Sequence, residues 1–199
     1  MQKGFTLAEV LVTLTIIGVV AALTLPTLNM DINKREKSVR LQKFYNVMDQ
    51  TIRLSEMDHG RLNRWDNTLN YETYLKEYIT PYLKATIVGK GNDAHLEFPD
   101  GSSMTFYKGG CLDFIYDVNG PNKGKNTHGY DVFRFLACAT DANGLAWCDG
   151  QGGFCTYRES VMDKSNRSSL LNKCKSNAAY CSALLEYDGW EFKNDYPFK

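Results

Sequence analysis

The chain lacks a surplus of charge of either sign. Its 199 residues contain 23 Lys and Arg and 23 Asp and Glu, so the formal net charge at neutral pH is zero. Proteins that bind nucleic acid as their main role usually carry a basic excess or a clustered basic patch. The even balance therefore gives no support to a nucleic-acid partner, and we expect none.

The motifs of common catalytic and cofactor sites are also missing. The sequence has no Gly-x-Ser-x-Gly, no His-Glu-x-x-His and no Gly-rich loop followed by Lys-Ser/Thr. The histidines His59, His95 and His128 are scattered, and the cysteines lack the C-x-x-C spacing of a zinc site. We therefore expect a protein that is not an enzyme, and any ATP-driven step would belong to other proteins.

What the chain does have is a long apolar segment near its start. About 20 apolar residues suit a transmembrane helix of about 30 Å, and residues 5–25 have that length and character apart from Glu9. A charge inside the bilayer costs about 2.5–3.5 kcal/mol, which indicates a functional carboxylate with a partner. A cleaved secretory signal peptide is an alternative, although its apolar stretch is usually only about 7–15 residues.

The N-terminal 30 residues resemble the prepilin signature of type IV pilins and type II secretion pseudopilins. The matching features are a short leader ending at Gly4, then Phe5-Thr6-Leu7, Glu9 and a long apolar helix with Pro26 where such helices often bend. The resemblance implies that prepilin peptidase cuts after Gly4 and methylates the new N-terminal amine at Phe5. It also implies that Glu9 pairs with the N-terminal amine of a neighbouring subunit.

The resemblance therefore implies a structural subunit of a type IV pilus or a type II secretion pseudopilus. Its partners would be other pilin or pseudopilin subunits, prepilin peptidase and an inner-membrane assembly platform. A buried charge is tolerable when it is paired, so Glu9 would select the register of the subunits. Apolar packing would come from Leu7, Leu11, Ile16 and Val20. The alternative is a single-pass, membrane-tethered extracytoplasmic binding module, with calcium as a candidate ligand.

Four regions are expected along the chain. They are a leader at 1–4, a transmembrane and filament-core helix at 5–28, an amphipathic continuation of that helix at 29–59 and a globular pilin-like head at 60–199. The continuation ends near His59-Gly60, where glycine suits a helix stop. Its apolar residues recur at spacings of mostly three and four, which predicts one buried stripe. The stripe contains Ile32, Val39, Phe44, Val47, Met48, Ile52 and Leu54.

The head shows one helical segment followed by alternating patterns. Residues 70–84 read as a helix bent or ended by Pro81, and residues 95–107 alternate on both sides of the turn 99–101. Two further strands are expected at 111–118 and 130–137, and the aromatics of 181–198 are expected to pack on the head. The predicted fold class is α+β and pilin-like, with a long helix packed on a small antiparallel meander and disulfide-stapled C-terminal loops.

All six cysteines lie between residues 111 and 181, and the even number predicts three disulfides formed in an oxidising compartment. If residues 118 and 131 face each other in an antiparallel pair, the same register places Cys111 opposite Cys138. Cys148 and Cys155 bracket a six-residue loop that a bridge could close. Cys174 can pair with Cys181 only if the helix breaks between them, so exchanges among the last four cysteines stay open.

Two signals disagree about the side of the membrane on which the head lies. A basic cluster follows the apolar segment, which by the positive-inside rule favours a cytoplasmic head. It contains Lys34, Arg35, Lys37, Arg40 and Lys43. The cysteines and the leader favour the other side. We expect a single-pass protein of the bacterial inner membrane with its head in the periplasm or outside.

The loop 117–131 holds the most metal-like set of side chains. Asp117, Asn119, Asn122 and Asp131 supply oxygens of the kind that Ca²⁺ prefers, although Ca²⁺ takes about six to eight of them. The full calcium-hand pattern is absent, and Asn and Gly also favour simple turns. A calcium site and a metal-free turn both stay open here, and we expect no other cofactor.

Overall fold

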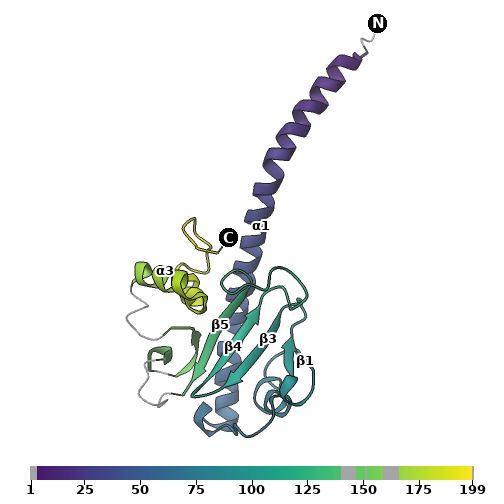
Figure 1. Cartoon of the computed structure of the whole chain (residues 1–199). Helices are drawn as coiled ribbons and strands as arrows, with labels where there is room; N and C mark the ends of the chain where they lie inside the picture. Colours follow the sequence, from purple (N-terminus) through teal and green to yellow (C-terminus); the bar gives the residue numbers. More distant parts are fainter. Residues whose placement is uncertain (1–3, 140–146, 151, 159–165, 199) are drawn as a thin grey trace. The chain divides into compact units, whose positions relative to one another are not determined.

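The computed structural model describes residues 4–139, 147–150, 152–158 and 166–198. The chain divides into two compact units, Met1–Glu36 and Lys37–Lys199, which are described separately. We call the second the head unit. Figure 1 shows a long helix, α1, followed by a sheet and a group of C-terminal helices.

Helix α1 spans Leu7–His59 as one run of 53 residues that passes through Pro26 without a break. It ends where expected, because Gly60 follows with φ of +80°, a conformation that glycine adopts without strain. The amide of Gly60 donates to the carbonyl of Glu56 at 3.0 Å and closes the last turn.

The sheet is a six-stranded antiparallel meander in which each strand pairs with the next along the chain (Figure 1). Its strands are β1 (Thr86–Val88), β2 (His95–Glu97), β3 (Ser103–Lys108), β4 (Cys111–Asp117), β5 (Val132–Cys138) and β6 (Gly153–Thr156). The long helix with an antiparallel sheet confirms the α+β class. The turn at 99–101 joins β2 and β3 as predicted, whereas the short edge strands β1 and β6 were not anticipated.

The remaining helices are short. They are α2 (Tyr71–Tyr74), a π-helical turn at Leu75–Ile79, α3 (Arg167–Ser176) and α4 (Cys181–Tyr187), with single 3-10 turns at Leu62–Arg64, Gly91–Asp93, Trp147–Gly150 and Ala178–Tyr180. The helix predicted over 70–84 is therefore shorter than expected. Asn70 caps its start by accepting from the Thr73 amide at 2.9 Å, and it stops before Pro81, which cannot continue a helical ladder.

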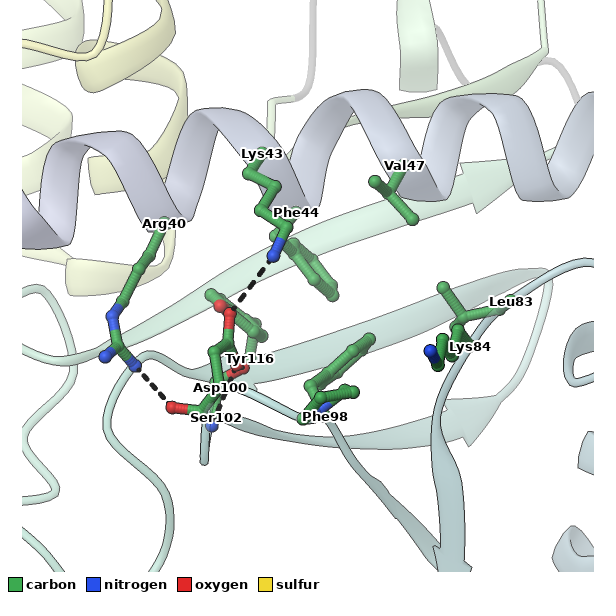
Figure 2. Close-up of a pocket in the computed structure, with 11 residues that line it drawn as sticks. Arg40, Lys43, Phe44, Val47, Leu83, Lys84, Phe98, Asp100, Ser102 and Tyr116 are labelled. Carbon is green, nitrogen blue, oxygen red and sulfur yellow. Dashed lines mark hydrogen bonds and ion pairs between the residues drawn. The ribbon is translucent and has the colours of Figure 1, made fainter.

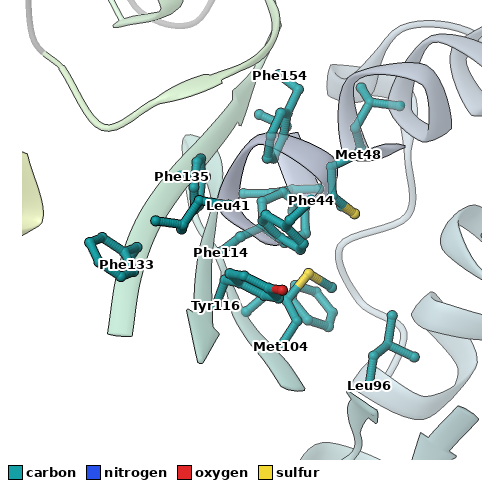
Figure 3. Close-up of a cluster of buried hydrophobic side chains, with 14 of the residues drawn as sticks. Leu41, Phe44, Met48, Leu96, Met104, Phe114, Tyr116, Phe133, Phe135 and Phe154 are labelled. Atoms are coloured by element: carbon teal, nitrogen blue, oxygen red, sulfur yellow. The ribbon is translucent and has the colours of Figure 1, made fainter. Parts of the chain in front are cut away.

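The core of the head unit lies between α1 and one face of the sheet (Figure 3). Phe44 of α1 stacks on Tyr116 of β4 with ring centroids 3.8 Å apart, and it also contacts Phe135 of β5 at 5.1 Å. Burying one large apolar side chain contributes about 1.5–3 kcal/mol. The sheet and α1 thus stabilise each other through a continuous aromatic layer.

The predicted apolar stripe on α1 was only partly right. Phe44, Met48 and Ile52 are buried, but Ile32 and Val39 are 61% and 58% exposed, and Leu54 is 37% exposed. The stripe missed Leu41, which is fully buried. Leu41 begins the 41, 44, 48, 52 series that faces the sheet, whereas Val39 lies two positions away and points elsewhere.

The C-terminal aromatics pack on the head as expected. Trp190 and Tyr196 are buried, and Phe192 and Phe198 pack partly buried against the same core. The Tyr196 hydroxyl donates to the Gly129 carbonyl at 2.6 Å, which ties the chain end to the loop 117–131.

Candidate functional site

The front half of α1 carries a continuous apolar surface. An 18-residue stretch, Leu7–Thr24, is long and apolar enough to cross a membrane, and none of it is buried inside the protein. Large exposed apolar side chains on and just before it are Phe5, Leu7, Val10, Leu11, Val12, Leu14, Ile16, Ile17, Val19, Val20 and Leu23. Exposed apolar surface of this extent marks a membrane or protein contact, and it fits a single-pass, membrane-anchored protein.

The polar side chains of this stretch are satisfied within the helix itself. The hydroxyls of Thr13, Thr15 and Thr24 each donate to the carbonyl four residues earlier, at 3.0, 2.8 and 2.9 Å. Such internal hydrogen bonds remove the cost of placing a hydroxyl in lipid. Glu9 is the one charged residue between Leu7 and Thr24.

Glu9 and Thr6 form a capping box at the start of α1. The Glu9 carboxylate accepts from the Thr6 amide and from the Thr6 hydroxyl, both at 2.8 Å and both on Oε2. In return the Glu9 amide donates to the Thr6 hydroxyl at 3.3 Å. This reciprocal pattern satisfies backbone donors that every helix start leaves without a partner.

This capping role was not predicted from the sequence, for which only an external partner of the carboxylate was expected. The signal was present, since Thr-x-x-Glu before an apolar run is the sequence pattern of a capping box. Glu9 therefore has a local function that does not depend on any second subunit.

The Gly4–Phe5 bond lies ahead of the helix, which begins at Leu7. A side chain placed on Gly4 would meet no atom within 4 Å, and Phe5 is 90% exposed. The bond thus lies in an exposed segment that precedes the helix. Pro26 lies inside α1, and its side chain is outside the described part of the structure.

In the loop 117–131, Asp131 is the central acceptor. Its buried carboxylate accepts from the amides of Lys125, Asn126 and Thr127 at 2.9, 3.1 and 2.5 Å. Hydrogen bonds to an ionised acceptor are roughly twice as strong as neutral ones. One side chain thus organises the C-terminal half of the loop.

Asp117 organises the other half. It accepts from the amides of Asn119 and Gly120 at 3.2 and 3.0 Å. The pKa of Asp117 is raised above its ordinary value, mainly by burial and also by nearby Asp131, although the two amide hydrogen bonds act in the opposite direction. Gly120 has a φ of +86°, and a Cβ there would lie 2.3 Å from the Gly101 carbonyl oxygen, so only glycine fits.

Of the four calcium candidates, the two carboxylates bind backbone amides of the loop itself, and Asn119 Oδ1 is buried without a hydrogen-bond partner among the described residues, so a calcium site here stays a prediction. Asp117 and Asp131 both receive backbone N–H groups, Asn119 is half-buried and Asn122 is exposed. Among the described residues, no group of three His, Cys, Asp or Glu side chains gathers as a potential metal site. The hydrogen bonds to Asp117 and Asp131 organise the two halves of the loop.

Three disulfides staple the head unit: Cys111–Cys138, Cys148–Cys155 and Cys174–Cys181. The first joins β4 to β5 in the expected register, with Cys111 directly opposite Cys138. The third becomes possible because α3 ends at Ser176 and α4 begins at Cys181, which supplies the required break. Together the bridges hold the second half of the sheet and the C-terminal helices.

Two family models match the chain, and the boundary between them lies close to residue 25, where the apolar segment ends. A family described as "Prokaryotic N-terminal methylation motif" matches residues 1–25, and one described as "Family of unknown function (DUF6613)" matches residues 27–199. No curated protein and no solved structure matches the chain. The first match identifies a pilin-like prepilin signature. The chain is thus a type IV pilin-like precursor at its N-terminus and belongs, through the rest of its length, to the DUF6613 family.

Proposed function

We propose that this protein is a structural subunit, of the major or the minor kind, of a type IV pilus or type II secretion pseudopilus, and not an enzyme. The observation that carries the proposal is a methylation motif at residues 1–25 on a helix whose apolar side chains are exposed. The same surface suits lipid before assembly and the packing of neighbouring helices afterwards.

In the proposed sequence of events, α1 first anchors the chain in the bacterial inner membrane. Prepilin peptidase cuts between Gly4 and Phe5 and methylates the amine of Phe5. The subunit then leaves the membrane through an assembly platform and packs against other pilin-type subunits. The three disulfides support a head on the oxidising side of the membrane.

In the assembled filament, the Glu9 carboxylate would pair with the Phe5 amine of a neighbouring subunit. In the single chain both of its hydrogen bonds to Thr6 end on Oε2. A carboxylate has two oxygens and about four acceptor positions, so capping and pairing can coexist. We infer that Glu9 starts the helix in the precursor and selects the register in the filament.

The first test is the intact mass and N-terminal sequence of the protein from its native membrane. The expected chain begins at methylated Phe5. A Gly4→Val variant, whose side chain meets open space in the free protein, is the control and should retain the leader. A wild-type chain that keeps Met1, or that is cut near Ala22, would contradict the proposal and leave a tethered or secreted binding domain.

A second test separates the charge of Glu9 from its capping role. Glu9→Gln keeps an acceptor for the Thr6 amide, because Gln also serves in capping boxes, but it removes the charge. Filament recovery in a sheared fraction should fall at least tenfold with Glu9→Gln. Thr6→Val removes the capping hydroxyl but keeps the carboxylate, and it should leave recovery near wild type. The opposite ranking would show that capping, not pairing, is the role of Glu9.

A further inference from the structure

A pocket of about 250 Å³ opens beside α1 within the head unit. Figure 2 shows α1 along one side and the β2–β3 turn on the other. Its lining residues are Arg40, Lys43, Phe44, Val47, Leu83, Lys84, Phe98, Pro99, Asp100, Ser102 and Tyr116. The pocket is separate from the apolar front of α1 and from the loop 117–131.

The inner part of the pocket is aromatic. Phe98 meets Phe44 edge-on with centroids 5.8 Å apart, and it meets Tyr116 edge-on at 6.0 Å. Aromatic rings favour such offset and edge-to-face contacts, so a further ring would be well accommodated. An apolar cavity of about 150 Å³ is enough to bind benzene. The pocket therefore has room for one aromatic side chain.

The rim of the pocket is cationic. Arg40, Lys43 and Lys84 line it together with a single carboxylate, Asp100, which gives a formal charge of three positive minus one negative. Lys43 Nζ lies 3.6 Å from Asp100 Oδ2, and Arg40 donates to the Asp100 and Val118 carbonyls at 3.0 Å each. Cations at a rim attract the electron-rich face of an aromatic ring and nearby negative charge. The favoured occupant is an aromatic side chain in acidic surroundings.

Such a side chain exists on the opposite flank of α1. Tyr187 ends α4 and is 44% exposed. The adjacent Glu186 accepts from the Tyr45 hydroxyl at 3.2 Å, which places this end of α4 beside Tyr45 of α1. Tyr45 is two residues from both Lys43 and Val47, and two residues turn a helix by about 200°. The pocket and Tyr187 therefore lie on opposite sides of α1.

The surroundings of Tyr187 complement the rim in charge. Residues 186–195 contain four carboxylates, Glu186, Asp188, Glu191 and Asp195, and one cation, Lys193. Arg158 and Arg167 pair with three of these carboxylates, and the charge of Lys175 also acts on Asp195, so the cations around these residues balance the four carboxylates. Glu191 is exposed next to this turn. Glu191 therefore presents an exposed negative charge four residues from Tyr187, whereas the pocket rim carries an excess of positive charge.

We propose that Tyr187 of one copy inserts into this pocket on the next copy. α1 stands between the two features, so Tyr187 does not reach the pocket of its own chain. A contact between opposite flanks is heterologous and joins copies in one orientation in series, as a filament requires. This inference rests on the proposed function and adds to it a specific contact between neighbouring heads.

Tyr107 offers a matched comparison. It is 54% exposed, more than Tyr187, but it pairs across strands with Asp113 on the sheet face opposite the buried Phe106 and Phe114. It therefore points away from α1. An aromatic probe at position 107 is therefore a control: it is at least as accessible as position 187 but lies on a face that the proposed contact does not use.

The test uses the full chain with photoreactive benzoylphenylalanine at position 187, in cells that first make an unmodified copy in isotopically heavy medium and then make the probe-carrying copy in light medium. After irradiation and shearing, mass spectrometry should find cross-links from position 187 to Val47, Leu83 or Phe98 of the other isotopic form. The same probe at position 107 should give at least tenfold fewer cross-links to those residues.

A second variant tests the pocket itself. Val47 is half-buried in its wall, so Val47→Trp fills the pocket from α1 and should reduce the cross-links from position 187 at least tenfold. Filaments that form with cross-links elsewhere, or only within one chain, would overturn the contact but leave the proposed function standing. Chains that are never cut after Gly4 and form no filaments would overturn both.

Discussion

At the residue scale, two carboxylates do more structural work than their sequence context suggested. Glu9 and Asp131 were both singled out for external partners, a neighbouring amine and a calcium ion. In the structure each first satisfies backbone N–H groups nearby. Acidic residues that interrupt an apolar or glycine-rich segment thus deserve a search for local donors before a ligand is assigned to them.

Asp131→Asn should destabilise the head by about 1–3 kcal/mol, because the amide cannot accept equally from three backbone N–H groups. The change is measured as a lower midpoint of thermal unfolding for the full chain in detergent. Asn122→Ala, at an exposed position of the same loop, is the control and should stay within about 0.5 kcal/mol of wild type.

The same measurement addresses calcium. Since the loop is held by hydrogen bonds, excess calcium and a chelator should give the wild-type chain the same midpoint. Ligands that bind the folded state raise it. A calcium-dependent rise that disappears in Asp131→Asn would instead establish a metal site in the loop.

At the scale of single elements, α1 is stabilised in the head through one narrow face. Met48→Ala removes a fully buried side chain between α1 and the sheet and should cost about 2–5 kcal/mol. Val39→Ala, on the same helix but 58% exposed, should cost much less. Denaturant unfolding of both variants measures the loss of unfolding free energy. Equal losses for the two variants would show that Met48 does not lie in the core.

The C-terminal segment is held by Arg167, which bridges Asp188 and Asp195 with four N–O contacts of 2.7–2.8 Å. Hydrogen bonds from Arg167 lower the pKa of Asp195 to about 2. A carboxylate with a lowered pKa stabilises the folded state above its unfolded value of 3.8, and the contribution is lost as the pH falls towards 2.

Protection of residues 190–198 against hydrogen exchange, corrected for the intrinsic rate, should therefore decrease between pH 4 and pH 2. Arg167→Gln should show reduced protection already at neutral pH. A segment that remains equally protected in that variant would be held by its aromatic contacts alone.

At the scale of the whole molecule, the three disulfides link the fold to the oxidising compartment proposed for the head. Reduction should add two hydrogens for each of the three bridges, seen by intact mass. Replacing Cys111 and Cys138 together by Ala should cost more stability than replacing Cys148 and Cys155, because the loops close over 27 and 7 positions. The chain-entropy difference is about 1 kcal/mol, read from unfolding midpoints. The reverse order would point to strand pairing that retains the first loop without its bridge.

Much of this architecture followed from sequence because the signals are local. Apolar length predicted the front of α1, a strong turn predicted the β2–β3 hairpin, and constant register brought Cys111 to Cys138. The short edge strands and the exposure of Val39 did not follow, because they depend on which faces meet in three dimensions. The pocket could not be predicted from the sequence for the same reason, because its lining residues come from α1, the turn after Ile79, the β2–β3 hairpin and β4.

The capping box at the start of α1 has a consequence for maturation. Both of its members, Thr6 and Glu9, lie beyond the Gly4–Phe5 bond, and the helix begins at Leu7. Removal of the leader would therefore leave the first turn of the helix as it was. Maturation would give the chain end a new positive charge without changing the start of the helix. The same helix could then pass from prepilin peptidase to the assembly platform without refolding.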